Sequence, residues 1–440
     1  MPLTAKSRRF ARSGTACAAL IGATALVAAC SSSGGGGSAS NGKVTITLSM
    51  QQTDVQTGDP TTWDLVKAFE KKYPNITVTV TGQPVAQHNQ SIEVAAQSHT
   101  LPTVFWVESA QVGAELAKSG ALLNLAPIMA KEGITTQTIP AATLAQFKAG
   151  SIQFGLPYQA LLTGLYFNKK ILSDNGLTLP TTFDQLLHVA TVLHAKGIVT
   201  IAYGANQSAY AVWSLLTDLD RFGYDGKIKA ILAGQASYDN ADFLRYYTDI
   251  QKLQKAGAFS SDVSNLTYNQ AVSQFTSGKA AMLDSGVWAA SQIQGSPVGP
   301  DTGFWAGPHF TDGVGNQDIA MNVVGAPISV SGSVKPGTAE YSAVEKFIGF
   351  YYGAAGQQIF ADNGQPPVTT YQPKIPAADT VFSSVLSAVR GLPAPKAQPD
   401  QYLTTAEQNA MYDSIFGVIE GQLTPQAAMD MVQKALTAGA

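Results

Sequence analysis

Cysteine is almost absent from this chain of 440 residues, which has only Cys17 and Cys30. Cys17 lies in an N-terminal segment that we expect to be removed, so the mature chain can form no intramolecular disulfide and no cysteine-based zinc site. Histidine is also scarce, with five scattered copies. His188 and His194 lie six positions apart on one predicted helix and therefore do not share a face. The sequence predicts no metal site.

Charged residues are scarce as well. They make up 13% of the chain, about half the usual share, which excludes long solvated helices and coiled coils. The formal net charge is −3, and removal of four cationic leader residues leaves −7. A mildly acidic surface without a basic stripe argues against nucleic acid as a partner.

Catalytic signatures are missing too. The chain has no Gly-x-Ser-x-Gly elbow, no His-Glu-x-x-His helix, no phosphate-binding loop and no Gly-x-Gly-x-x-Gly after a strand. Acidic neighbours such as Asp218 and Asp220 could serve a glycoside hydrolase, but we expect such carboxylates to lie solvated on a loop. The sequence therefore predicts a protein that is not an enzyme and needs no cofactor.

Residues 1–29 are typical of a secretory signal peptide. Lys6, Arg8, Arg9 and Arg12 precede an apolar run at positions 15–29. This run is shorter than the roughly 20 apolar residues that a membrane-spanning helix needs. In a twin-arginine signal the phenylalanine after the two arginines would stand one position later than Phe10 does. This mismatch favours the general secretory route.

Cys30 follows the apolar run directly, in the sequence Leu-Val-Ala-Ala-Cys. This resembles a bacterial lipobox, in which the cysteine is acylated and becomes the first mature residue; an ordinary Ala-x-Ala cleavage site with a chance cysteine is the alternative. Residues 31–42 contain five serines and five glycines, a flexible tether with a reach of about 20 Å. Such a tether favours the lipobox, so we predict lipidation at Cys30 and anchoring to the outer face of the bacterial cell membrane.

The body of the chain has the pattern of an α/β protein. Residues 44–48 alternate apolar and polar side chains, an apolar helical stripe ends at Pro74, and residues 76–80 alternate again. Strand, helix and strand at this spacing predict a βαβ unit with parallel strands, and we expect Thr61 and Asp64 to cap its helix. Strands and helices continue to alternate to about residue 352, and helices resume at 405–420 and 425–437. The proline- and glycine-rich stretch 364–399 is predicted to be irregular.

Aromatic residues follow several predicted strands, where ligands bind in α/β sheets. Trp106 is followed by Glu108 and Ser109, Tyr158 precedes Gln159, and Trp288 comes shortly after Asp284. Tyr210 and Trp213 follow the strand that ends at Tyr203. Flat rings beside carboxylates and amides suit a sugar. If these rings line a cleft, Trp106, Tyr210 and Trp288 should contribute to ligand binding more than to the core.

Six segments together carry a resemblance to a known family. They are residues 65–74 (Leu-Val-Lys-Ala-Phe-Glu-Lys-Lys-Tyr-Pro), 156–158, 165–169, 180–184, 275–282 and 343–348. In their order and spacing, behind a lipobox, the chain resembles the family 1 extracellular solute-binding proteins of ABC importers, the group that includes maltose-binding protein. The resemblance covers most of residues 44–440.

This resemblance implies a two-lobed fold of the type II periplasmic-binding-protein kind, each lobe a mixed sheet flanked by helices. Lobe one would hold residues 43–159 and 285–352, and lobe two residues 160–284 and 353–440. A carbohydrate, a di- or oligosaccharide, would bind in the cleft of a monomer and pass to the membrane subunits of an ABC permease after hinge closure. The ligand-binding residues expected in the cleft are Gln51, Asp54, Trp106, Glu108, Ser109, Tyr158, Gln159, Tyr210, Trp213, Asp284 and Trp288. Two alternatives stay open: a receptor of the same fold for a non-sugar solute, and a lipid-anchored secreted glycoside hydrolase.

Overall fold

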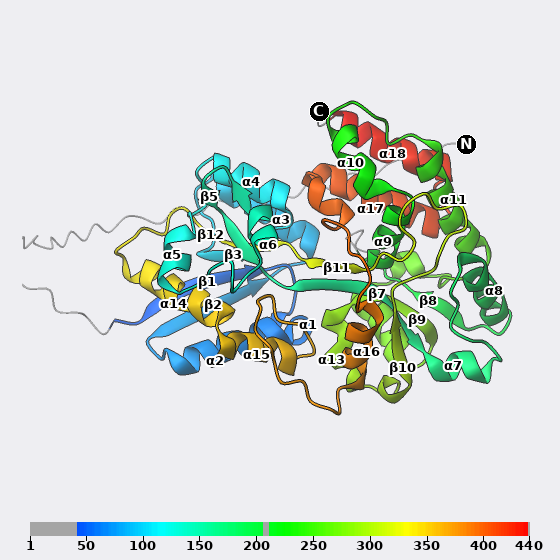
Figure 1. Cartoon of the computed structure of the whole chain (residues 1–440), viewed down its shortest axis with the longest axis horizontal. Helices are drawn as coiled ribbons and strands as arrows, with labels where there is room; N and C mark the ends of the chain where they lie inside the picture. Colours follow the sequence, from blue (N-terminus) through cyan, green and yellow to red (C-terminus); the bar gives the residue numbers. More distant parts are fainter. Residues whose placement is uncertain (1–41, 206–210, 439–440) are drawn as a thin grey trace, which may run out of the picture. The chain divides into compact units, whose positions relative to one another are not determined.

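A computed structural model describes residues 42–205 and 211–438. The predicted signal peptide (1–29), Cys30 and all but the last residue of the predicted tether lie outside these residues. The described chain forms two main β-sheets, and helices pack on both of them (Figure 1).

The first sheet has the strand order β2-β1-β3-β12-β6. β1 (Val44–Met50) runs parallel to β2 (Ile76–Gly82) and β3 (Val104–Trp106), so the predicted βαβ unit is confirmed. β12 (Pro327–Val330) adds antiparallel to β3 and to β6 (Gly155–Pro157). The first lobe is built on this sheet.

The crossover helix of the βαβ unit is α2 (Pro60–Lys72). Its N-cap is Asp59, whose side chain accepts a hydrogen bond from the backbone N–H of Thr62 at 3.1 Å. The cap expected from Thr61 and Asp64 is therefore wrong, because the carboxylate just before Pro60 already satisfies the orphan donor. Thr61 is buried instead.

Two helices from late in the sequence return to the first lobe. α14 (Ala339–Tyr352) and α15 (Ala354–Asp362) pack beside β1 and α2 (Figure 1). The rings of Phe69 on α2 and Phe347 on α14 meet edge to face, with their centroids 5.2 Å apart. The other elements of this lobe are α1 (Val55–Gly58), α3 (Val85–Gln97), α4 (Ala110–Lys118), α5 (Ala126–Lys131), α6 (Ala141–Gln146), β4 (Lys148–Ala149) and β5 (Ile152–Gln153).

The second sheet is centred on β7 (Ala160–Asn168), the longest strand. β7 pairs antiparallel with β9 (Ala280–Gly286), which in turn pairs parallel with β8 (Val199–Ala202). β10 (Thr302–Trp305) and β11 (Met321–Val324) pair antiparallel with the other edge of β7, one after the other along it. Every residue of β9 is buried, as expected for a strand covered on both faces.

The helices of the second lobe cover both faces of this sheet. The capping box predicted at Thr182 is confirmed at the start of α8. These helices are α7 (Lys169–Asp174), α8 (Phe183–His194), α9 (Trp213–Arg221), α10 (Tyr224–Leu232), α11 (Ala241–Lys255), α12 (Tyr268–Thr276), α13 (Ala290–Gln294), α16 (Thr380–Val389), α17 (Thr405–Ile419) and α18 (Pro425–Ala438). Four 3-10 turns complete the lobe: η1 (Val263–Asn265), η2 (Val287–Ala289), η3 (Gly299–Asp301) and η4 (Pro399–Tyr402).

The chain changes lobes at places that differ in part from the expected ones. The first crossing, between β6 and β7, lies where it was expected. The return to lobe one at residue 285 is wrong, because β10 and β11 still pair with β7 and the crossing falls between β11 and β12. The boundary at 353 is also too early, since α15 packs on α2 of the first lobe.

The stretch 364–399 is not irregular throughout. It contains α16, capped by Asp379, which accepts from the N–H of Phe382 at 3.0 Å. Val381, Phe382 and Val385 of this helix are fully buried in the second lobe. Because prolines and glycines are frequent in this stretch, the helical spacing of its apolar residues was not recognised from the sequence.

Among the helices of residues 42–205 and 211–438, none has the length and apolar character required to span a bilayer.

Candidate functional site

One cavity is lined by residues of both lobes, with the carboxyl ends of β3 and β6 on one side. It contains about 730 Å³ of empty space, the open solvent at its mouth included. Seven of the predicted ligand-binding residues line it: Gln51, Trp106, Glu108, Tyr158, Gln159, Trp213 and Trp288. The residues that the sequence analysis did not select are Gln52, Gly58, Asp59, Val85, Leu161, Tyr268, Gly325, Ala326, Gln398, Asp400, Gln401 and Tyr412.

Three aromatic rings of the second lobe form a cluster on the cavity wall. Trp213 opens α9, Trp288 lies in η2 directly after β9, and Tyr268 opens α12. The Trp213 ring lies 4.8 Å from that of Trp288 and 5.2 Å from that of Tyr268, centroid to centroid, both edge to face. Trp288 Nε1 donates a hydrogen bond to the Tyr268 hydroxyl at 2.9 Å, which fixes the two rings against each other.

Gly286 allows Trp288 to take this position. A Cβ atom at residue 286 would lie 2.1 Å from the Trp288 ring, far inside van der Waals contact, so only glycine lets the ring fold back over the end of β9. Tyr268 was missed because a tyrosine at the start of a helix carries no mark that separates it from a core residue.

The first lobe contributes Trp106 at the end of β3. Its ring is 7% exposed and meets the His88 ring edge to face at 5.6 Å. Burial lowers the pKa of His88 to about 4, so the imidazole supporting Trp106 is neutral near pH 7. Because Trp106 also belongs to the first lobe's core, the expectation that it would contribute little to that core is wrong.

Tyr158 is held from two sides. Its hydroxyl donates to the carboxylate of Asp59, and its carbonyl oxygen accepts from the Tyr351 hydroxyl at 2.6 Å. Burial raises the pKa of Asp59 above its usual range. One carboxylate thus caps α2 and orients a cavity tyrosine at the same time.

A second group of polar side chains includes two carboxylates from opposite lobes. Glu108 follows β3, and Asp400 lies in η4; both are nearly buried. Burial, followed by the nearby charge of Asp400, raises the pKa of Glu108 to about 8. Burial raises the pKa of Asp400 to about 6, although the Tyr412 hydroxyl, which donates to Asp400 Oδ2 at 2.6 Å, opposes the shift.

η4 and the start of α17 also connect the second lobe to the first. Gln401 Nε2 donates to the backbone oxygen of Glu108 at 3.2 Å, and Thr405 Oγ1 donates to Glu93 Oε1 at 3.0 Å. Sequence reasoning missed Gln401 because it lies between the stretch predicted to be irregular (364–399) and the helix predicted from residue 405, where no pattern pointed to a site.

Two predicted site residues have structural positions elsewhere. Asp54 is exposed and caps α1 by accepting from the N–H of Gln56, and it lines a neighbouring cavity. Ser109 is buried and caps α4, where it accepts from the N–H of Val112. Tyr210 lies outside the described residues.

Asp284 does not line the cavity, but it positions a residue that does. Its carboxylate accepts hydrogen bonds from the N–H and the hydroxyl of Ser214, at 2.9 and 2.6 Å, and from the Tyr203 hydroxyl at 2.7 Å. Burial raises the pKa of Asp284 to about 7. These bonds hold the first turn of α9 and therefore the adjacent Trp213.

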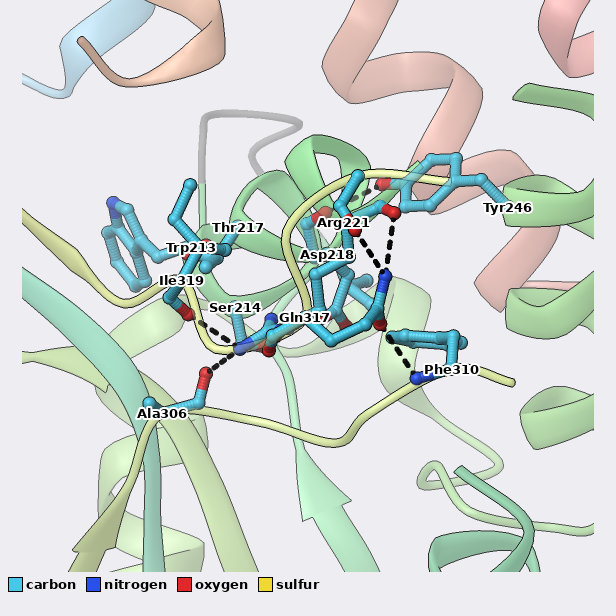
Figure 2. Close-up of polar contacts among 12 residues, drawn as sticks. Trp213, Ser214, Thr217, Asp218, Arg221, Tyr246, Ala306, Phe310, Gln317 and Ile319 are labelled. Atoms are coloured by element: carbon cyan, nitrogen blue, oxygen red, sulfur yellow. Dashed lines mark hydrogen bonds and ion pairs between the residues drawn. The ribbon is translucent and has the colours of Figure 1, made fainter. Parts of the chain in front are cut away.

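Asp218 and Asp220 lie buried on α9, so the expectation of a solvated loop is wrong. Figure 2 shows the reason for Asp218: the guanidinium of Arg221, 1% exposed, donates to its carboxylate at 2.5 Å. The same guanidinium donates to the backbone oxygens of Ala306 and Ile319, each at 2.9 Å (Figure 2). The pair anchors the segment between β10 and β11 and is not part of the cavity.

Within residues 42–205 and 211–438, no group of three or more His, Cys, Asp or Glu side chains is arranged to hold a metal ion.

Comparison with known proteins places this geometry in context. A family profile described as bacterial extracellular solute-binding protein matches residues 53–358. The chain is 24% identical over 370 residues to a multiple sugar-binding protein of Streptococcus mutans, covering 79% of this chain and 80% of that protein. It is 23% identical over 374 residues to a galactooligosaccharide-binding protein of Bacillus subtilis, covering 79% and 85%.

Solved structures share the fold. A chitin oligosaccharide binding protein superposes with a TM-score of 0.79 at 22% identity, covering 90% of this chain and 98% of that one. Maltose-bound MalE3 of T. maritima superposes with a TM-score of 0.73 at 19% identity, covering 90% and 100%. The two-lobed α/β fold expected from the sequence is confirmed.

Proposed function

Since the chain belongs to the bacterial extracellular solute-binding protein family, we propose that it is the carbohydrate receptor of an ABC importer. It binds a di- or oligosaccharide between its lobes and delivers it, by hinge closure, to the permease subunits in the membrane. One observation carries the proposal: an aromatic cluster and several carboxylate and amide side chains line a single cavity supplied by both lobes. Aromatic rings cover the C–H faces of a sugar, and the polar groups bind its hydroxyls.

The relatives support a sugar as the solute. Two of them are described as binding multiple sugars or galactooligosaccharides, and two structural neighbours as binding chitin oligosaccharide or maltose. The proposal includes lipid anchoring through Cys30 on the outer face of the membrane, with the tether of residues 31–42 between lipid and receptor.

The decisive experiment is a thermal-shift screen of the purified protein against mono- and oligosaccharides. A ligand at 100 times its Kd should stabilise the protein by about 2.7 kcal/mol, which is visible as a raised Tm. Failure of every sugar to raise the Tm, alongside a positive shift with a non-sugar solute, would contradict the proposal.

The carboxylates of Glu108 and Asp400 give the hydrolase alternative a specific test, since glycosidases use two acids. We expect a bound oligosaccharide to be recovered unchanged after prolonged incubation, as measured by mass spectrometry. Steady release of a cleaved sugar, lost in Glu108→Gln, would favour the hydrolase.

A further inference from the structure

Three hydrogen-bond acceptors in the polar part of the cavity have no donor. Glu108 Oε2, Asp400 Oδ1 and Gln51 Oε1 are buried, and none has a hydrogen-bond partner within the described part of the chain. Buried acceptors without partners are costly, typically by about 1–3 kcal/mol each. Three of them in one cavity point to groups that a bound ligand would satisfy.

The surrounding contacts leave these oxygens available. Tyr412 and Gln398 donate to Asp400 Oδ2, at 2.6 and 3.2 Å, and Oδ1 has no partner. Gln401 reaches the backbone oxygen of Glu108 and not its carboxylate. The neighbouring donors, Asn89 and Thr405 at Glu108 among them, therefore orient both side chains and leave one oxygen of each without a partner.

No positive charge balances the carboxylates. None of the described residues lining the cavity is Lys, Arg or His, whereas Asp59, Glu108 and Asp400 are acidic, and residues 206–210, outside the described part, include no charged residue. The charge of Asp400 contributes to the raised pKa of Glu108, so the two side chains lie close enough to interact. With a pKa of about 6, Asp400 is mostly ionised near pH 7, and an anionic group placed beside it would be repelled.

We propose that Glu108 and Asp400, one from each lobe, form a donor-selecting end of the sugar site. They accept hydrogen bonds from hydroxyl or ammonium groups of one sugar unit, and they exclude sugars that carry a carboxylate, sulfate or phosphate there. The inference rests on the proposed function and adds a substrate class to it: neutral or amino sugars, and not uronic or phosphorylated ones. Sites built to bind a donor reject ligands lacking it strongly, because buried acceptors are then left unpaired.

The first arm of the test uses the wild-type protein and three sets of probes. The neutral set holds cellotriose, maltotriose, xylotriose, raffinose and N-acetylated chitotriose; the amino set holds deacetylated chitotriose; the acidic set holds trigalacturonic acid, sialyllactose and trehalose 6-phosphate. We expect Tm to rise with at least one neutral or amino sugar and with no acidic one. An acidic sugar that binds as tightly as a neutral one would overturn the inference. If no sugar of the three sets raises the Tm, the proposed function itself is contradicted.

The second arm uses calorimetric titration of the sugar found in the first. Glu108→Gln and Asp400→Asn keep the side-chain volume and replace one acceptor oxygen with a donor, so we expect each to weaken binding tenfold or more. Asp430→Asn, which removes one negative charge from the exposed side of α18, is the matched control and should bind like wild type. Wild-type affinity in both cavity variants would overturn the inference; if either variant fails to fold, the probe series on the wild-type protein still decides it.

Discussion

Trp288 is partly buried: it packs against the core of its own lobe and lines the cavity. Its partners are the Tyr268 hydroxyl and the Trp213 ring. Trp106, by contrast, is 7% exposed and packs in the first lobe's core. The two tryptophans line the same cavity, but removing them should have different consequences.

Trp288→Ala should weaken sugar binding about tenfold or more, since a buried apolar side chain contributes about 1.5–3 kcal/mol, and should lower the Tm of the unliganded protein only modestly. Trp106→Ala should lower stability by about 3–5 kcal/mol, as for a core tryptophan. Calorimetric titration beside a thermal melt for each variant separates the two effects. Equal loss of Tm in both variants would show that Trp288 is a core residue as well.

α9 is the element that joins the aromatic cluster to the rest of the second lobe. Its first turn is held by Asp284 through Ser214, and its last turn by Arg221, which bonds to the segment between β10 and β11. The Asp218–Arg221 pair is fully inside the protein. Removing one partner of such a pair leaves an uncompensated buried charge.

Arg221→Met should therefore destabilise the protein by about 3–5 kcal/mol, and by more at pH 8 than at pH 5, because the unpaired Asp218 can then be buried only in its protonated form. Lys170→Met, which removes the cation of the exposed Lys170–Asp174 pair, is the control and should leave the Tm almost unchanged. Denaturant unfolding at both pH values is the measurement. A loss in Arg221→Met no larger than in the control would show that the pair does not anchor α9.

Several buried carboxyl groups make the stability of the whole molecule depend on pH. Burial raises the pKa of Glu108 to about 8, of Asp218 and Asp284 to about 7, and of Asp400 to about 6. The folded protein therefore binds more protons than the unfolded chain between about pH 4 and pH 8. Stability must fall as pH rises through this window, because it falls wherever the folded state binds more protons.

We expect the Tm of the unliganded protein to decrease from pH 5 to pH 8. Glu108→Gln should flatten the upper part of this curve, from pH 7 to pH 8, because the group that titrates there is removed. Differential scanning calorimetry at four pH values tests both statements. A Tm that increases steadily from pH 5 to pH 8 would contradict the assignment of raised pKa values.

The predicted lipid anchor at Cys30 concerns the chain as a whole. Replacing Cys30 by Ala should release the protein into the medium with its fold and sugar affinity intact, because both lobes are built from residues after position 41. Detergent-free fractionation of cells followed by a thermal melt of the released protein is the measurement. Retention of the Cys30→Ala protein in the membrane fraction would contradict lipid anchoring.

Local sequence patterns predicted local structure well and long-range placement less well. The period of two in residues 44–48 and the capping box at Thr182 depend on neighbouring residues, and both are confirmed. The lobe assignment of β10 and β11 depends on their pairing with β7, more than 100 positions earlier in the chain. Such a long-range pairing cannot be predicted from the pattern of neighbouring residues.

For the candidate site too, the residues near strand ends could be predicted from the sequence and the residues brought in from distant segments could not. Trp106 ends β3, and Glu108 and Tyr158 come just after β3 and β6, so the rule for strand ends found them. Asp400, Gln401 and Tyr412 reach the cavity from a 3-10 turn and a late helix, where only the folded chain brings them beside β3. Asp54 and Asp284 were selected by type and position, but hydrogen bonds to nearby backbone N–H groups give them structural roles.

The position of β12 has a consequence for how the protein is made. The strand sits between β3 and β6 and pairs Ile328 with Trp106, so the first sheet stays incomplete until about three quarters of the chain has left the ribosome. Contacts this distant in sequence slow folding, because a large loop must close before they form. Nascent chains should thus persist without a finished N-terminal lobe, a condition that suits passage through a narrow export channel before folding.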